Sequence, residues 1–482
     1  MSCKVSHWYT SRVEMEDTLE TTSPVARIAS ARTPFPDWAW WALTALLSGV
    51  AAYGAVDGLG AARTLALVVG VAVAGVTLYR PVFGPLVIMA AMPLDVAGRL
   101  IVSPVTVTLF HLALLLTLGA WAVHLLFGRA RKVRFSAVDG AMALLVIAAL
   151  WSYPNSLSPG ETLFGAVRLA FLALLVLAFE NLVTTRLWLR RVLDVLLGTG
   201  FLMSLLTIAQ FVAPDLAPAA SGDTISVGGR QVARVSGLFD DPNILAGFLS
   251  IVVVVALFRL VHSSRMRQMA MYAAVFLCSS GALLLTFSRT GWLGAAAGCL
   301  VVLFFAPRAR KLLMVAVVCV SVIVALTVAG DAIAARADAI VNPTDNSAQT
   351  RVLMFESTIE TIGDYWVWGT GLNGYDEAYP EYRIPGANLT VLKPHQVPLA
   401  LFAQMGVLGA LVAIVLVLAL GAQFVPVPAS GWSEEQKLVL AALAALMLES
   451  WFQYYLYFEY LWVFAALAVV ASRLAREGES SV

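Results

Sequence analysis

Long apolar stretches recur along almost the whole chain, and most of them are long enough to cross a lipid bilayer as a helix. The chain has 482 residues, of which 60% are hydrophobic and only 13% are charged. Inside hydrocarbon the backbone must satisfy its own polar groups, and among open structures only helices do so. The sequence therefore predicts an all-α integral membrane protein.

We expect about fourteen transmembrane helices. The stretch that starts at Pro81 also holds Gly84, Pro85 and Pro93, so it could instead be re-entrant. The expected spans cover residues 38–56, 62–79, 81–97, 104–127, 136–153, 163–183, 191–212, 242–260, 268–287, 291–306, 312–329, 397–420, 437–455 and 457–474.

These spans divide the chain into five regions. We expect a disordered cytoplasmic tail at 1–37, helices 1 to 11 at 38–329 and helices 12 to 14 at 397–474. A large extracytoplasmic loop with short helices fills 330–396, and a second cytoplasmic tail covers 475–482. Loops as long as 330–396 usually carry function.

The orientation follows from the basic residues, because short loops rich in Lys and Arg stay in the cytoplasm. With both termini inside, most of the basic residues fall on the inner side. Ten fall on the outer side, which translocation disfavours: Arg63, Arg99, Arg168, Arg230, Arg234, Arg289, Arg336, Arg351, Arg383 and Lys393. For Arg63, Arg99 and Arg336 we expect snorkelling or a structural ion pair.

Several partners are not expected. The net charge is +1 and there is no long basic block, so nucleic acid is not an expected partner. The four cysteines lie in the inner tail or within spans, where no disulfide forms. The outer acidic residues lack a recognised ligand spacing, so we expect neither a metal nor another cofactor.

Two outer arginines lie at the starts of helices. Arg234 precedes Asp241, which can cap a helix, and Pro242, which suits the first helical position. A further span starts next to Arg289. Two helix N-termini and two guanidinium groups on one surface would form a site for a dianionic or diphosphate head group.

His395 is the one histidine that falls in an outer loop. It directly precedes a predicted span, and a helix N-terminus favours the neutral ring, which can accept a proton. A lone histidine is more often a surface residue than a catalyst. Its position alone therefore leaves both roles open.

These residues resemble, in order, the motifs of the bacterial O-antigen ligase and O-antigen polymerase superfamily. The similar segments are Arg234-x-x-Gly237-x-Phe239-x-x-Pro242-Asn243, Ser288-Arg289-x-Gly291, Arg351 followed by Trp368-Gly369-x-Gly371, and His395-Gln396 followed by Leu399, Gln404, Gly406 and Gly409. Gln396 stands where the family usually has Asn, and Gln404 stands where it commonly has Glu. If the family's Glu orients the histidine or balances its charge, this chain must do so with another residue.

The resemblance implies a GT-C-like membrane glycosyltransferase that assembles cell-surface polysaccharide in the bacterial inner membrane. It would transfer a glycan from an undecaprenyl-diphosphate carrier to an acceptor sugar hydroxyl, with inversion and without a metal. Arg234 and Arg289 would stabilise the leaving diphosphate, with Arg230, Arg351 and Asn243 as further ligands. His395 would be the general base.

Three further points stay open at this stage. The sequence does not separate a polymerase from a ligase, so the acceptor is either a glycan or a lipid-linked molecule. A small-anion transporter would place charges near the bilayer midplane in broken helices, and the sequence places them at the outer ends. A non-catalytic membrane scaffold would leave the outer arginines and His395 without a role.

Overall fold

A computed structural model describes residues 61–94, 96–97, 99–101, 106–130, 132–215, 224–227, 230–341, 346–387, 394–425 and 431–479. In these ranges the chain is helical apart from two short antiparallel hairpins, so the all-α prediction is confirmed. The expected tail at 1–37 and the expected span at 38–56 lie outside the described residues. Internal contacts divide the chain into one unit up to Pro81 and another from Val82 onward.

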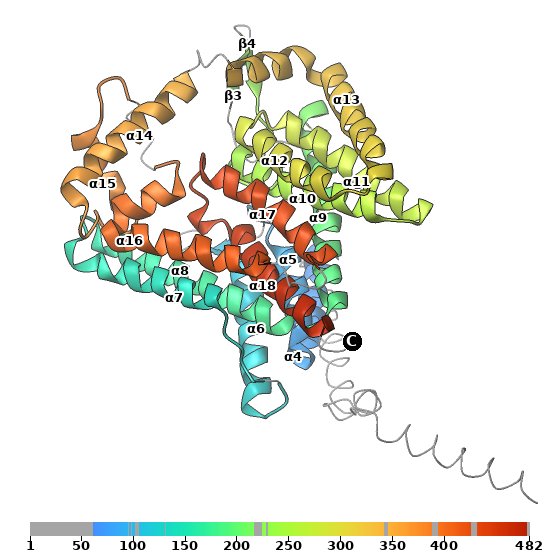
Figure 1. Cartoon of the computed structure of the whole chain (residues 1–482), viewed down its shortest axis with the longest axis horizontal. Coiled ribbons are helices and arrows are strands. Elements are labelled where there is room, and N and C mark those ends of the chain that lie inside the picture. The colour runs from blue at the N-terminus through green and yellow to red at the C-terminus, as the bar shows by residue number, and fades with distance from the viewer. Residues whose placement is uncertain are drawn as a thin grey trace, which may run out of the picture. The chain divides into compact units, whose positions relative to one another are not determined.

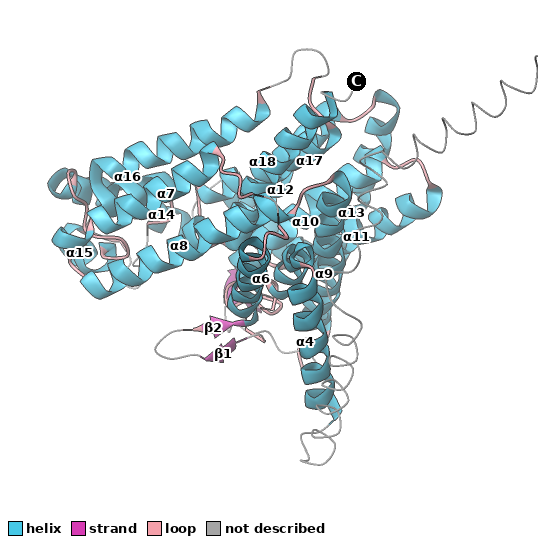
Figure 2. Ribbon diagram, turned by 90° about the horizontal axis from the view of Figure 1, so that it is seen from below, coloured by secondary structure: helices cyan, strands magenta, loops and turns pink. Residues whose placement is uncertain are grey.

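In the first unit, the described residues form α4 (Ala61–Tyr79). The second unit contains the remaining elements (Figures 1 and 2). Its helices are α5 (Gly84–Ala91), α6 (Leu109–Leu126), α7 (Ala137–Trp151), α8 (Pro159–Leu182), α9 (Arg186–Val212), α10 (Pro242–His262), α11 (Met266–Leu285), α12 (Arg289–Phe305), α13 (Arg308–Val341), α14 (Asn346–Tyr365), α15 (Tyr375–Tyr382), α16 (Val397–Gly421), α17 (Glu434–Ser450) and α18 (Glu459–Glu479). Short 3-10 turns are η1 (Pro81–Phe83), η2 (Tyr153–Asn155), η3 (Ala422–Phe424) and η4 (Tyr455–Tyr457).

The two hairpins pair neighbouring strands. One joins β1 (Arg99–Ile101) to β2 (Val107–Thr108), and the other joins β3 (Thr224–Val227) to β4 (Arg230–Ala233). The second hairpin leads directly into the segment that carries Arg234. Neither hairpin was expected from the sequence, because both lie in segments between apolar runs.

Among the described residues, seven helices are long and apolar enough to cross a membrane, so a polytopic membrane protein is confirmed but the number fourteen is not. They are α6, α7 continued by η2, α8, α9, α10, α11, and α16 continued by η3. The expected span at 81–97 contains α5, whose 8 residues reach only about 12 Å. The expected loop at 330–396 begins with helical residues, because α13 continues to Val341.

Helix α10 lies at the centre of the second unit and is 89% buried along its apolar window. It contacts α9, α11, α12, α13 and α17. From Ile244 to Leu257 its sequence is apolar on every side apart from Ser250, as expected for a helix that other helices surround. Its first turn therefore has a fixed position among its neighbours.

Helix α12 packs closely against both α10 and α17 because its contact face carries glycines. A Cβ atom at Gly298 would lie 2.8 Å from the carbonyl oxygen of Ala441 in α17, and it would also collide with Val254 in α10. Any larger side chain would push the three helices apart. α10, α12 and α17 thus form one compact group (Figures 1 and 2).

A kink in α16 receives the segment that follows α14. At Gly406 the backbone has φ 62°, a left-handed conformation that favours glycine. Val407 N donates to Trp366 O at 2.8 Å, and Thr370 N donates to Ala403 O at 3.0 Å. These bonds fix α14 and α15 relative to the start of α16.

Candidate functional site

Helices α10 and α12 begin as the sequence predicts. Asp241 caps α10: its carboxylate accepts a hydrogen bond from Asn243 N at 2.6 Å, and Pro242 occupies the first turn. Ser288 caps α12 through Gly291 N, at 3.5 Å. Both N-termini therefore keep backbone N–H groups and the positive end of the helix dipole at their starts.

The two helix starts meet at the side chain of Asn243. Its Oδ1 atom accepts hydrogen bonds from the Arg234 guanidinium at 3.0 Å and from Ser288 Oγ at 2.9 Å. The Nε atom of Arg234 donates to Thr286 O at 3.0 Å. The structure thus brings Arg234, Asn243 and the start of α12 into one network, which we call the Asn243 junction.

Arg289 is the first residue of α12 and directly follows Ser288. The side chains of Arg234 and Arg289 are each only 8% exposed, although both carry a charge. A charged group is that deeply buried only where the surroundings compensate the loss of hydration. Both arginines are thus more deeply buried than Arg99, whose side chain is 25% exposed and forms the expected ion pair, with Asp240.

The turn before α12 is strained. Phe287 has φ 53° and is fully buried, and such a conformation is uncommon for a bulky side chain. The turn carries the Thr286 carbonyl that receives Arg234 and the Ser288 hydroxyl that receives Gly291 N. Strain of this kind is retained where packing over-determines the backbone, and it is concentrated at functional sites.

Sequence reasoning missed Gln210, which anchors the segment containing Arg234. Its side-chain amide bonds both backbone groups of Gly237, at 2.9 Å each. Gly237 has φ 59°, and a Cβ atom there would lie 2.6 Å from Met203 Sδ. A buried glutamine inside an apolar span was the available signal, because a buried amide needs partners.

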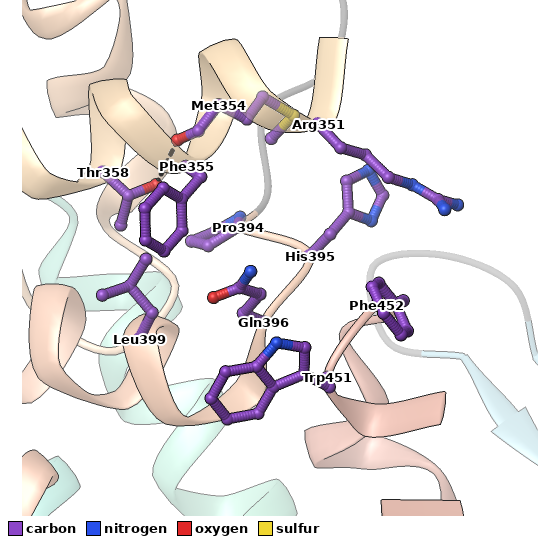
Figure 3. A pocket seen from close by; sticks show the side chains of 10 residues that line it. All are labelled: Arg351, Met354, Phe355, Thr358, Pro394, His395, Gln396, Leu399, Trp451 and Phe452. Carbon is purple, nitrogen blue, oxygen red and sulfur yellow. Dashed lines mark hydrogen bonds between the residues drawn. The ribbon is translucent and has the colours of Figure 1, made fainter. Parts of the chain in front are cut away.

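His395 lies in a small pocket of about 30 Å³ just before α16. Figure 3 shows its ring beside the side chain of Arg351, with the rings of Trp451 and Phe452 on the other side of the pocket. The wall comes from α14, from the segment before α16 and from the residues after α17: Arg351, Met354, Phe355, Thr358, Pro394, Gln396, Leu399, Trp451 and Phe452. A pocket of this volume admits a water or one hydroxyl group, and no whole sugar.

Burial lowers the pKa of His395 to about 4, and the charge of Arg351 acts in the same direction. Gln453 hydrogen-bonds the ring and opposes this shift more weakly. The neutral ring expected from the helix position is thus explained by burial and by Arg351. The Nδ1 atom is buried and has no hydrogen-bond partner among the described residues, which leaves it available to a ligand.

Gln404 does not line the His395 pocket. Its Oε1 atom accepts a hydrogen bond from Asn373 N at 2.6 Å, and its amide lies 3.4 Å from the Tyr454 hydroxyl. The residue therefore fastens the turn after α14 to α16. Gln404 therefore lies outside the group of residues that surround His395 directly.

The end of α17 links the two clusters. Trp451 and Phe452 line the His395 pocket, while the Tyr455 hydroxyl donates to Asn243 O at 2.9 Å. The charges of Asp241 and Arg351 also act on the Tyr455 hydroxyl. One short segment thus contacts the Asn243 junction and the His395 pocket.

Arg230 lies in β4, opposite Val227. Its role as a ligand of the diphosphate stays a prediction. The string Gly369-x-Gly371-x-x-Gly374 forms a turn, with φ 75° at Gly369. Among the described residues, no group of three His, Cys, Asp or Glu side chains could hold a metal ion.

The comparison with known families locates a domain in this region. Residues 273–414, from within α11 to within α16, match the family model of the O-antigen ligase. Over these residues the chain is similar to the O-antigen ligase family. The match supports the resemblance to the O-antigen ligase and polymerase superfamily that the sequence motifs indicate.

The matched segment includes Arg289, Arg351 and His395. Arg234 and Asn243 precede it and join it through Ser288. No curated protein matches the chain. The family match therefore gives the kind of protein, and the contacts described above give the residues that could act.

Proposed function

We propose that this chain transfers a glycan from an undecaprenyl-diphosphate carrier to a sugar hydroxyl at the extracytoplasmic face. The Asn243 junction carries the proposal, because it fixes two helix N-termini and a buried arginine at one point. Such an arrangement suits a diphosphate, whose oxygens accept hydrogen bonds from backbone N–H groups and guanidinium forks. The placement of basic residues in the loops favours the outer face for this end of α10 and α12.

Arg234 and Arg289 would stabilise the charge that develops on the leaving diphosphate. The acceptor oxygen forms a bond to the anomeric carbon, and the bond from that carbon to the phosphate oxygen breaks. Its electron pair leaves with the diphosphate, and the arginines hold this charge in a site that excludes water. No metal is required for this role, and attack from the face opposite the leaving group inverts the anomeric centre.

His395 would accept the proton of the attacking hydroxyl. A histidine with a pKa of about 4 is a weak base in the empty site. A bound diphosphate brings negative charge close to Arg351 and the ring, and such charge raises the pKa of an imidazole. The base would therefore become effective once the donor is bound.

The acceptor would enter beside the exposed aromatic rings of the His395 pocket. Trp451 is 52% exposed and Phe355 is 39% exposed, and both line the pocket. The pocket admits one hydroxyl, while an aromatic face outside it can pack against the apolar face of a sugar ring. Both a growing glycan and a lipid-linked core meet these requirements.

The test is transfer by purified protein in lipid nanodiscs. A lipid-linked oligosaccharide is incubated with either more of the same oligosaccharide or a lipid core, and the products are sized. A ladder of products identifies a polymerase, and a single addition to the core identifies a ligase. If neither acceptor is extended and no undecaprenyl diphosphate is released, the proposed function is wrong.

A further inference from the structure

The carboxyl group of Glu449, near the end of α17, is completely buried. Neither of its oxygens has a hydrogen-bond partner among the described residues, and it forms no ion pair with any of them. The guanidinium group of Arg168 lies over the ring of Tyr457, at 4.4 Å from its centroid. A buried carboxylate without donors would be very costly, so this group requires a physical explanation.

The fold makes room for this carboxyl group. A Cβ atom at Gly294 in α12 would lie 2.5 Å from Glu449 Cγ. A Cβ atom at Gly247 in α10 would lie 2.9 Å from Glu449 Oε2. Glycine on both neighbouring helices thus gives the side chain a fitted position between α10 and α12, beneath their first turns.

The two hydroxyl groups beside the carboxyl direct their protons elsewhere. Ser250 Oγ donates to Gly247 O at 2.9 Å, and the Tyr455 hydroxyl donates to Asn243 O at 2.9 Å. Each hydroxyl has one proton, and these two bonds use it, so toward Glu449 both oxygens can only accept. A protonated carboxyl has an O–H group to donate, whereas an ionised one has none.

We propose that Glu449 is a positioning residue, a neutral carboxyl that donates to the Tyr455 oxygen and thereby keeps the Tyr455 proton on Asn243. If Glu449 were ionised, the Tyr455 hydroxyl would turn toward it and Asn243 O would lose the bond from Tyr455. The Asn243 junction would then be less firmly held. The functional part of this inference rests on the proposed glycan transfer, since it assigns the junction to the donor.

Infrared spectroscopy tests the protonation state without any activity measurement. The difference spectrum between wild type and Glu449→Gln should show a carboxylic acid C=O band that the variant lacks. A band of an ionised carboxylate in its place would overturn the proposal. Glu435→Gln is the matched control, because Glu435 lies in the same helix and pairs with Arg190 at 3.3 Å.

Donor binding tests the positioning role. Glu449→Gln should keep the Kd for the lipid-linked donor within about twofold, since an amide also donates to Tyr455. Tyr455→Phe and Glu449→Ala should each weaken binding roughly tenfold, the factor for about 1.4 kcal/mol. The double variant should lose little more than either single variant, because the two residues act through one bond.

The outcomes separate the two proposals. If Glu449→Gln weakens donor binding as much as Glu449→Ala does, the positioning role is wrong. If Glu449→Ala does not fold, the Gln variant and the infrared band still decide the matter. If wild type transfers no glycan, the proposed function fails, while the infrared measurement still tests the neutral carboxyl.

Discussion

The Asn243 junction and the His395 pocket are built in different ways. The junction joins the first turns of two helices whose neighbours enclose them, and its arginines are almost fully buried. The pocket combines α14, the segment before α16 and the residues after α17, with exposed rings at its edge. A preorganised site suits a reacting group of constant chemistry such as a diphosphate, whereas an open edge suits acceptors that vary.

The largest effect is expected from removing the base. His395→Ala should reduce kcat by about 10²- to 10⁴-fold, the range for general base catalysis, and leave donor Kd unchanged. Single-turnover glycan transfer measures this loss. His262→Ala is the control, because His262 lies at the other end of α10. Undiminished transfer by the His395 variant would remove the residue from the mechanism.

A change at the start of α12, in the donor region, should affect both donor binding and turnover. Arg289→Lys should lower kcat/KM by about 10²-fold, because a point charge cannot replace a guanidinium fork at a developing anion. The matched control is Arg259→Lys, at the opposite end of α10, where Arg259 lies 4.0 Å from Asp194. Normal kinetics of the Arg289 variant would contradict bidentate binding.

The pH dependence should distinguish the empty site from the donor-bound one. The pKa of about 4 means that His395 is neutral above pH 4, so kcat/KM for the donor should fall only when acidification reaches that range. Bound diphosphate raises the pKa, so kcat should begin to fall at a higher pH. Identical acid limbs for kcat and kcat/KM would show that donor charge does not reach the ring.

Loss of an aromatic ring at the pocket edge should affect the acceptor alone. Trp451→Ala should raise KM for the acceptor roughly threefold to tenfold, as expected from about 0.5–1.5 kcal/mol for an aromatic contact. Trp366→Ala is a control with a similarly exposed ring, at 55%. If the Trp451 variant instead weakens donor binding, the division between the two regions is wrong.

The smallest change concerns one hydrogen bond in the junction. Ser288→Ala removes the bond to Asn243 Oδ1 but keeps the bond from Arg234. Donor affinity should fall by about fivefold, corresponding to about 1 kcal/mol for such a bond. Calorimetric titration of the donor measures this change. An unchanged affinity would mean that Arg234 alone orients Asn243.

Local features were predictable from the sequence, and contacts between distant segments were not. Asp241 and Ser288 cap helices by bonding backbone groups two or three residues further on, and Pro242 occupies a first turn. Adjacent residues in the sequence are therefore enough to predict these helix starts. By contrast, Trp451 reaches the His395 pocket from the segment after α17, far along the chain, and nothing in its spacing indicates that contact.

Lengths of helices were also only partly predictable. Hydropathy located α10 and α11 closely, because both are continuous apolar runs with clear ends. It failed at α5, where Pro and Gly residues shorten the helix, and at α13, which continues past its apolar part. In α13 the helical pattern continues beyond the hydrophobic residues, so a prediction from composition alone ends this helix too early.

The most direct test measures the Kd of the lipid-linked donor for wild type, His395→Ala and Arg289→Lys in the same nanodiscs. The account predicts that the His395 variant binds the donor as tightly as wild type but transfers glycan at least about 10²-fold more slowly, while the Arg289 variant binds the donor much more weakly. The opposite pattern, with weak binding by the His395 variant and normal binding by the Arg289 variant, would contradict the division into a donor junction and an acceptor pocket.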